Sequence, residues 1–196
     1  AIKGVQLSKR ANKIYLDRYF FTDLANVFPK FPQEIDTDQA LGALTQMHEL
    51  TGVKSASAMH DDQIFNFELS LPQLPKSELT QAVNFEVSNL SRIPESDLVV
   101  DYWLDGEAPK KSGANLKIRA FAARSEQVVD HMTKLEKAGF KPKSIESIML
   151  ANTETLRFNG YITPQSKCAI VDLGDSETVI GFVLNGALHY CRSEKM

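Results

Sequence analysis

The sequence predicts a mixed α/β or α+β fold, and two observations carry the prediction. Runs with the alternating apolar pattern of strands are interleaved with segments whose apolar residues recur every three to four positions, as in amphipathic helices. The resulting order is strands, helix, strands, helix, strands, helix, strand, helix, strands, which excludes a helical bundle and a β-sandwich. With 196 residues, 43% of them hydrophobic, the chain is long enough to bury a proper core.

The first part of the chain is predicted to begin with a hairpin. "IKGVQLSKRANKIYLDRYFF" holds two strand patterns around a polar turn. A helix is predicted in "DTDQALGALTQMHELTG", with Asp36 or Thr37 as its N-cap. Strands are predicted in "VKSASAM" and in "DQIFNFELSLP", where alternation places three apolar side chains on the buried face: Phe65, Phe67 and Leu69.

The second part continues the alternation of helices and strands. Ser77 is predicted to cap a helix whose buried stripe includes Val83, Val87 and Leu90. "LVVDYWL" and "LKIRAFAA" are predicted strands around the breaker-rich loop "DGEAPKKSGAN". A third helix is capped by Ser125, "KPKSIESI" is a short strand and "MLANTETLRF" a helix. "CAIVDLGDSETVIGFVLNGALHY" then gives further strands, with turns at Gly-Asp-Ser and at Asn-Gly.

Composition excludes several classes of protein. A net charge of −3 and a pI near 5.8 argue against a nucleic-acid binder, which shows a basic stripe. No apolar run approaches the ~20 residues that span a bilayer. Cys168 and Cys191 lie on predicted strands and are expected to be reduced and buried, since a core of this size needs no disulfide. The chain starts within one strand pattern and stops after another, so we expect a piece of a longer protein.

The search for catalytic or metal-binding patterns is negative. No Gly-x-Ser-x-Gly or Walker-type phosphate loop is present. Asp61 and Asp62 are adjacent on a predicted strand and would point to opposite faces, which disfavours paired acid–base catalysis. We therefore expect no catalytic residue and no metal ligand. The histidines are scattered, without metal-ligand spacing: His48, His60, His131 and His189.

The stretch "VDLGDSET" is the exception. A strand delivers Asp172 to a tight turn, where Gly174 permits close backbone approach and Ser176 and Thr178 add hydroxyl groups. Such a turn suits a phosphate tail with its hydrated magnesium ion, and these four residues are the candidate cofactor-binding positions. An ordinary hairpin turn uses the same residue types, and the other acidic residues of the stretch oppose an anion.

Several segments resemble one protein family. "IVDLGDSETVIGFVLNGALHYCRS" resembles the second phosphate-loop hairpin of the actin-like ATPase superfamily. The order of "IKGVQLS", "FELSLPQLPKSELTQAVNFEVSNLSRIPESDLVVDYWL" and "KLEKAGFKPKSIESI" resembles PilM-type pilus assembly proteins, with their relatives in MSHA pili and the GspL proteins of type II secretion. In the longest block, a Pro-rich turn, an amphipathic helix and an Ile-Pro stop lead into an Asp-Tyr strand.

The resemblance implies a fold and a division of the chain. It implies an actin-like (ribonuclease H-like) first lobe of residues 1–60 and 124–160, with an inserted α+β subdomain of residues 61–123. Residues 165–196 would begin a second actin-like lobe. The family's first phosphate loop and its adenosine-binding segment fall outside these residues. We therefore expect no cofactor here, and ATP with magnesium only in a longer chain.

The resemblance also implies a function. It is that of a cytoplasmic scaffold at the inner face of the inner membrane, which docks the cytoplasmic tail of a PilN-like membrane protein and needs no catalytic residue. The contact is expected on the inserted subdomain and its flanking groove, by strand addition at an unpaired edge, unless "DGEAPKKSGAN" covers that edge. Homo-oligomerisation stays open. An actin-like ATPase or sugar kinase, which needs an intact first phosphate loop, and an FtsA-like cell-division adaptor remain alternatives.

Overall fold

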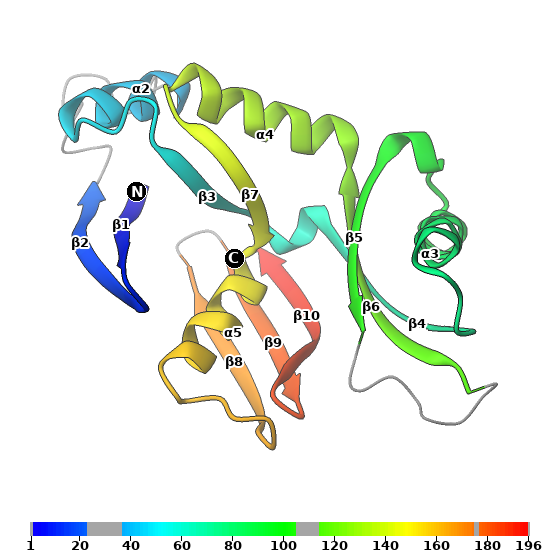
Figure 1. The fold of residues 1–196 in the computed structure, drawn as a ribbon. Coiled ribbons are helices and arrows are strands. Elements are labelled where there is room, and N and C mark those ends of the chain that lie inside the picture. The colour runs from blue at the N-terminus through cyan, green and yellow to red at the C-terminus, as the bar shows by residue number, and fades with distance from the viewer. Residues whose placement is uncertain (1, 23–36, 105–113, 175–176, 196) are drawn as a thin grey trace. The chain divides into compact units, whose positions relative to one another are not determined.

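The structure is a computed structural model that describes residues 2–22, 37–104, 114–174 and 177–195 (Figure 1). The chain divides into two compact units. Unit 1 comprises Ala1–Val53 and Lys134–Lys141, and unit 2 comprises Lys54–Thr133 and Pro142–Met196. This division differs from the domain boundaries predicted from the sequence, which stay a prediction.

The described elements are mixed in type, which confirms the predicted α/β class. Unit 1 holds β1 (Ile2–Arg10), β2 (Lys13–Thr22) and α2 (Thr37–Met47). Helix α4 (Ser125–Lys137) runs from unit 2 into unit 1. Unit 2 holds β3 (Lys54–Met59), the 3₁₀ turn η1 (Asp61–Gln63), β4 (Ile64–Leu71), α3 (Lys76–Ser91), η2 (Glu95–Asp97), β5 (Leu98–Leu104), β6 (Leu116–Arg124), β7 (Lys141–Ser147, whose first residue lies in unit 1), α5 (Ile148–Phe158), β8 (Lys167–Leu173), β9 (Glu177–Leu184) and β10 (Ala187–Lys195).

Unit 1 contains the predicted hairpin, since β1 pairs antiparallel with β2. The hairpin contacts the end of α2, where the Phe20 ring stacks on the His48 ring at 4.6 Å between centroids. Helix α2 stops at Met47, earlier than its quoted segment, because Glu49 adopts a left-handed φ of 56°. Asp36 lies outside the described residues, and so does the side chain of Thr37, the first residue of α2, so the predicted N-cap stays a prediction. Gly139, with φ 99°, ends α4, and its carbonyl oxygen accepts from the Gly52 amide at 2.7 Å.

In unit 2, β4, β6 and β5 form an antiparallel sheet in that order, and α3 covers one face of it (Figure 1). The predicted alternation on β4 is confirmed, because Leu69 is buried in this core and Phe65 and Phe67 pack against it. The core between α3 and the sheet is apolar throughout: Leu69, Leu71, Leu79, Val83, Val87, Ile93, Leu98, Leu116, Ile118, Ala120 and Ala122.

Two details of α3 differ from the prediction. Ser77 is not the N-cap: the helix starts at Lys76, because the Pro75 carbonyl oxygen already accepts the Leu79 amide at 2.8 Å. Leu90 is 55% exposed rather than part of the buried stripe. The chain leaves the helix at Ser91 and turns, and Ile93 fills the core position instead.

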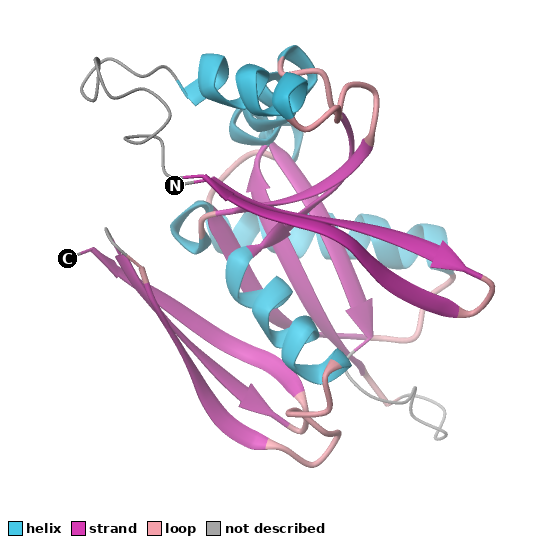
Figure 2. Ribbon diagram, turned by 90° about the vertical axis from the view of Figure 1, so that its left-hand side faces the viewer, coloured by secondary structure: helices cyan, strands magenta, loops and turns pink. Residues whose placement is uncertain are grey.

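Strands β8, β9 and β10 form an antiparallel meander, and α5 packs on one face of it (Figure 2). Met149, Val179 and Leu188 are the buried centre of this layer. Cys191 is half-buried against it, but Cys168 is exposed, so the prediction of two buried thiols is wrong for Cys168. Cys168 lies near the start of β8, an edge strand of the meander, where fewer neighbours cover a side chain.

Candidate functional site

The face of the β4–β6–β5 sheet that α3 leaves uncovered forms the floor of a cavity of about 360 Å³, which lies wholly in unit 2. We call this cavity the groove. The strand register places Ile64, Val99 and Ala123 side by side on this face, because residues paired across antiparallel strands share a face. The walls come from α4, from β7 and from the first turn of α5.

Two aromatic rings lie further along the floor. Trp103 on β5 stacks on Phe121 on β6, with 4.9 Å between ring centroids and 17° between planes. Trp103 is 37% exposed, and Val99, four positions earlier on β5, is 46% exposed. The floor therefore offers apolar surface that a partner side chain can cover, and aromatic surface of this kind dominates interface energetics.

Charged side chains at the groove are mostly acidic. Among the described residues, Asp101 and Glu146 line it together with one basic residue, Lys143. Burial raises the pKa of the Glu146 carboxyl above its usual value, and the charges of Asp101 and Glu154 raise it further. A cation placed between these carboxylates would relieve that repulsion. The groove therefore suits an apolar ligand that carries a basic group.

The groove is flanked by strands with one partner each. In the described part of the chain, β5 pairs with β6 alone and β7 pairs with β3 alone. Their second edges present backbone N–H and C=O groups to which an extended segment can add. The loop "DGEAPKKSGAN", expected as a cover for such an edge, is described only from residue 114 onward.

The candidate phosphate turn is tight but does not gather its predicted residues. The Gly174 amide donates to the Glu177 carbonyl oxygen at 2.9 Å, and a Cβ on Gly174 would lie 2.7 Å from that oxygen. Asp172 accepts from Asn152 Nδ2 at 3.0 Å. Thr178 pairs with Leu173, the residue after Asp172, so Thr178 and Asp172 lie on opposite faces of the meander. Ser176 lies outside the described residues, and phosphate binding stays a prediction.

Solved structures of other proteins share this fold. The structure matches a chain of a solved "PilM-PilN type IV pilus biogenesis complex" with a TM-score of 0.75 and 18% identity, over 97% of this chain and 57% of that chain. The fold is shared with that chain of the PilM–PilN complex. The cytoplasmic domain of EpsL, an inner-membrane component of the type II secretion system of Vibrio cholerae, matches with a TM-score of 0.61 and 8% identity, over 96% of this chain and 64% of that chain.

These likenesses confirm the PilM-type resemblance and the α/β class at the level of the fold. A third solved protein, from Bacteroides thetaiotaomicron and described as having an actin-like ATPase fold, is more distant, with a TM-score of 0.44 and 10% identity. This chain spans less than two thirds of the length of the PilM–PilN and EpsL chains. No protein-family model matches the chain, and neither does any curated protein sequence.

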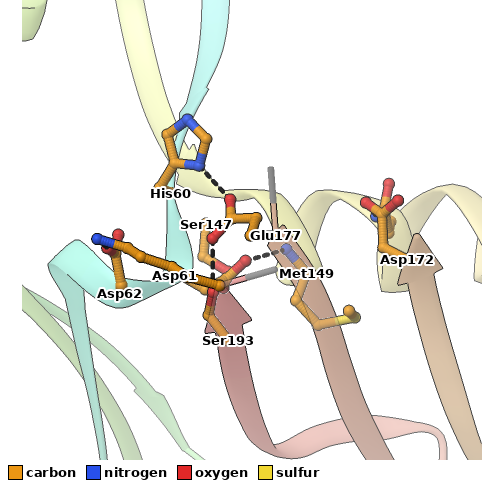
Figure 3. A network of polar contacts seen from close by, with 10 residues as sticks. His60, Asp61, Asp62, Ser147, Met149, Asp172, Glu177 and Ser193 are labelled. Atoms are coloured by element: carbon orange, nitrogen blue, oxygen red, sulfur yellow. Dashed lines mark hydrogen bonds and ion pairs between the residues drawn. The ribbon is translucent and has the colours of Figure 1, made fainter. Parts of the chain in front are cut away.

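Within this PilM-like fold, Asp61 lies at the centre of a buried polar network (Figure 3). Its carboxylate accepts from Ser147 Oγ at 2.6 Å and from the Met149 amide at 3.0 Å. The Cys191 thiol also lies 3.6 Å from Asp61 Oδ1. Burial, and then the charge of Asp61, raise the pKa of Cys191 to about 12, so this thiol remains a donor.

The neighbouring residue, His60, makes a separate contact. His60 Nδ1 is paired with the Glu177 carboxylate, which also accepts from the Ser193 hydroxyl (Figure 3). The hydrogen bond from Ser193 is the largest cause that lowers the pKa of Glu177. Burial, the next largest, raises it, and the hydrogen bond and charge of His60 lower it again, so the pKa lies below its usual value. Asp62 forms an exposed ion pair with Lys195 at 3.7 Å. These contacts tie η1 to β9 and β10.

The sequence prediction missed this network. It placed Asp61 and Asp62 on a strand, whereas both belong to the 3₁₀ turn η1, with Asp61 buried and Asp62 exposed. Within the four described ranges, no group of three or more His, Cys, Asp or Glu side chains is arranged to hold a metal ion. None of the described helices combines the length and the apolar character needed to cross a membrane.

Proposed function

We propose that this chain is a component of a type IV pilus or type II secretion machine that binds the cytoplasmic segment of a PilN-like membrane protein at the inner face of the inner membrane. The fold shared with a chain of a PilM–PilN complex and with the EpsL cytoplasmic domain supports the choice of machine. The proposal assigns the chain a scaffolding role without a catalytic step.

The observation that carries the proposal is the groove. A cavity of about 360 Å³ with a stacked aromatic floor and an acidic rim is large enough for several side chains of an extended peptide. Peptides that add to a strand edge gain affinity from main-chain hydrogen bonds and specificity from alternate side chains that enter pockets. We therefore propose an extended segment whose apolar side chains cover Trp103 and whose basic group lies near Asp101 and Glu146.

Fluorescence titration tests the proposal directly. Trp103 is the single tryptophan of the chain and lines the groove, so its emission reports occupancy. A synthetic peptide of the cytoplasmic segment of a PilN-like protein from the same organism is titrated into the chain. We expect saturable binding with a blue shift of the emission, because the peptide removes water from the indole ring.

Matched variants locate the contact. Val99→Glu places a charge in the groove and is expected to weaken binding about tenfold or more. Val129→Glu is the control, since Val129 is also an exposed valine of unit 2 but does not line the groove. If Val99→Glu binds the peptide as tightly as Val129→Glu does, the contact lies outside the groove. If the unchanged chain does not bind the peptide, the proposed function is contradicted.

A further inference from the structure

Asp61 is a buried carboxylate that contacts residues of the groove without lining it. Only 6% of its surface is exposed. It belongs to η1, which connects Met59 at the end of β3 to Ile64 at the start of β4, and both of these residues line the groove. A displacement of η1 would therefore move two groove residues at once.

The carboxylate also reaches the opposite side of the groove. Ser147, at the end of β7, donates from its hydroxyl group to Asp61 and accepts from the Leu150 amide at 3.0 Å, so it caps α5. Ser147 and Leu150 both line the groove. The Met149 amide, in the same turn, donates to the second carboxylate oxygen. One oxygen of Asp61 thus binds the N-cap residue of α5, and the other binds a backbone amide in its first turn (Figure 3).

We propose that Asp61 is a positioning residue for the groove. Its contacts hold one wall, formed by Ser147 and Leu150, at a fixed distance from the floor, which begins at Ile64. The binding consequence rests on the proposed function of the groove, whereas the positioning itself does not. A carboxylate is suited to this role because it only accepts, and its partners here are a hydroxyl, a backbone amide and a thiol, which all donate. The helix N-terminus further favours a negative group at this place.

The substitution Asp61→Asn tests the proposal with little change in volume. The amide retains one acceptor oxygen but turns an NH₂ group toward a donor, so one contact to the first turn of α5 is lost. We expect the dissociation constant for the PilN-like peptide to rise about tenfold, within the range seen for residues that act through others. We also expect the emission of Trp103 to shift to the red, although Asp61 does not line the groove.

The control is Asp62→Asn, which removes the same charge from the next residue. Asp62 is exposed and pairs with Lys195, and it does not line the groove. Peptide affinity within about twofold of the unchanged chain is expected for this variant. If Asp61→Asn lowers the melting temperature but leaves Trp103 emission and peptide affinity as they were, Asp61 is only structural and the proposal is wrong.

Two further measurements keep the outcomes separate. If Asp61→Asn does not fold, Ser147→Ala removes the link to the wall while the contact between Asp61 and the Met149 amide remains, and the same shifts are expected. If the peptide does not bind the unchanged chain, the proposed function fails by itself. The positioning role is then decided by two measurements: hydrogen exchange at the amides of Met149 and Leu150, and the emission of Trp103. If both measurements are the same in the two variants as in the unchanged chain, the positioning role is wrong.

Discussion

The guanidinium of Arg119 donates to both the backbone carbonyl oxygen and the ring Nδ1 of His189, at 2.8 and 3.0 Å. Because a guanidinium only donates, Nδ1 is the acceptor in the second contact. Arg119 is only 3% exposed, and Glu68 lies 3.6 Å from its guanidinium. A buried cation on β6 therefore joins the β4–β6–β5 sheet to β10 through two contacts with His189.

Replacing Arg119 by methionine is expected to destabilise unit 2 by about 1–3 kcal/mol, because the His189 carbonyl oxygen loses a charged donor. Urea unfolding followed by Trp103 emission measures the change, since this tryptophan lies in unit 2. Lys117→Met is the control: Lys117 is exposed two positions earlier on the same strand, and its loss is expected to cost less than about 0.5 kcal/mol. Equal effects would show that Arg119 contributes no more than a surface charge.

The two thiols are expected to react at different rates with an alkylating reagent. Cys168 is exposed, whereas the thiol of Cys191 is half-buried and its pKa is raised to about 12, so little thiolate forms there. Mass spectrometry of peptides after timed treatment with iodoacetamide at pH 8 should show Cys168 modified first. In urea, where burial is lost, the rates should converge. Simultaneous modification in the folded protein would contradict the environment described for Cys191.

We expect the free energy of unfolding to fall at acidic pH because Glu177 becomes protonated. Its pKa is lowered in the folded state, so it contributes stability that is fully present above its unfolded value of about 4.5 and is lost as the pH falls through the lower folded value. Unfolding free energies of the unchanged chain and of Glu177→Gln, measured between pH 7 and pH 3, give the test. The two curves should converge as the pH falls, and a constant difference over the whole range would exclude this linkage.

The elements could be predicted from local patterns where those patterns are strong. The alternation of Phe65, Phe67 and Leu69 predicts the core face of β4, because a strand buried on one face has a period of two. The exact start of α3 could not be predicted, because Ser77 and Pro75 are both acceptable near a helix start and the backbone hydrogen bond of Pro75 decides between them.

The groove and the Asp61 network could not be predicted in the same way, because both depend on contacts between distant segments. Asp61 and Ser147 are separated by 86 positions. Nothing local in "HDDQ" distinguishes a buried Asp61 from an exposed Asp62. Adjacent carboxylates in a sequence raise the question of paired acid–base catalysis, whereas the burial of Asp61 alone follows from its contacts with Ser147 and with the Met149 amide of α5.

Our last prediction is that this chain does not bind Mg-ATP with micromolar affinity. Asp172 is engaged by Asn152, Thr178 lies on the opposite face of the meander, and the Glu177 carboxylate, at the same turn, is held by His60 and Ser193. Among the described residues of this turn, a phosphate group would therefore meet the carboxylates of Asp172 and Glu177.

Calorimetric titration with Mg-ATP tests this prediction, since a micromolar constant corresponds to about −8 kcal/mol and is readily measured. The variant Glu177→Gln removes one negative charge at the turn and serves as the matched comparison. If charge at the turn is the only obstacle, this variant should gain measurable affinity. If neither protein binds, charge is not the only obstacle, which agrees with the opposite faces of Asp172 and Thr178 in the described part of the turn. Micromolar binding by the unchanged chain would overturn the prediction and favour a nucleotide-binding role.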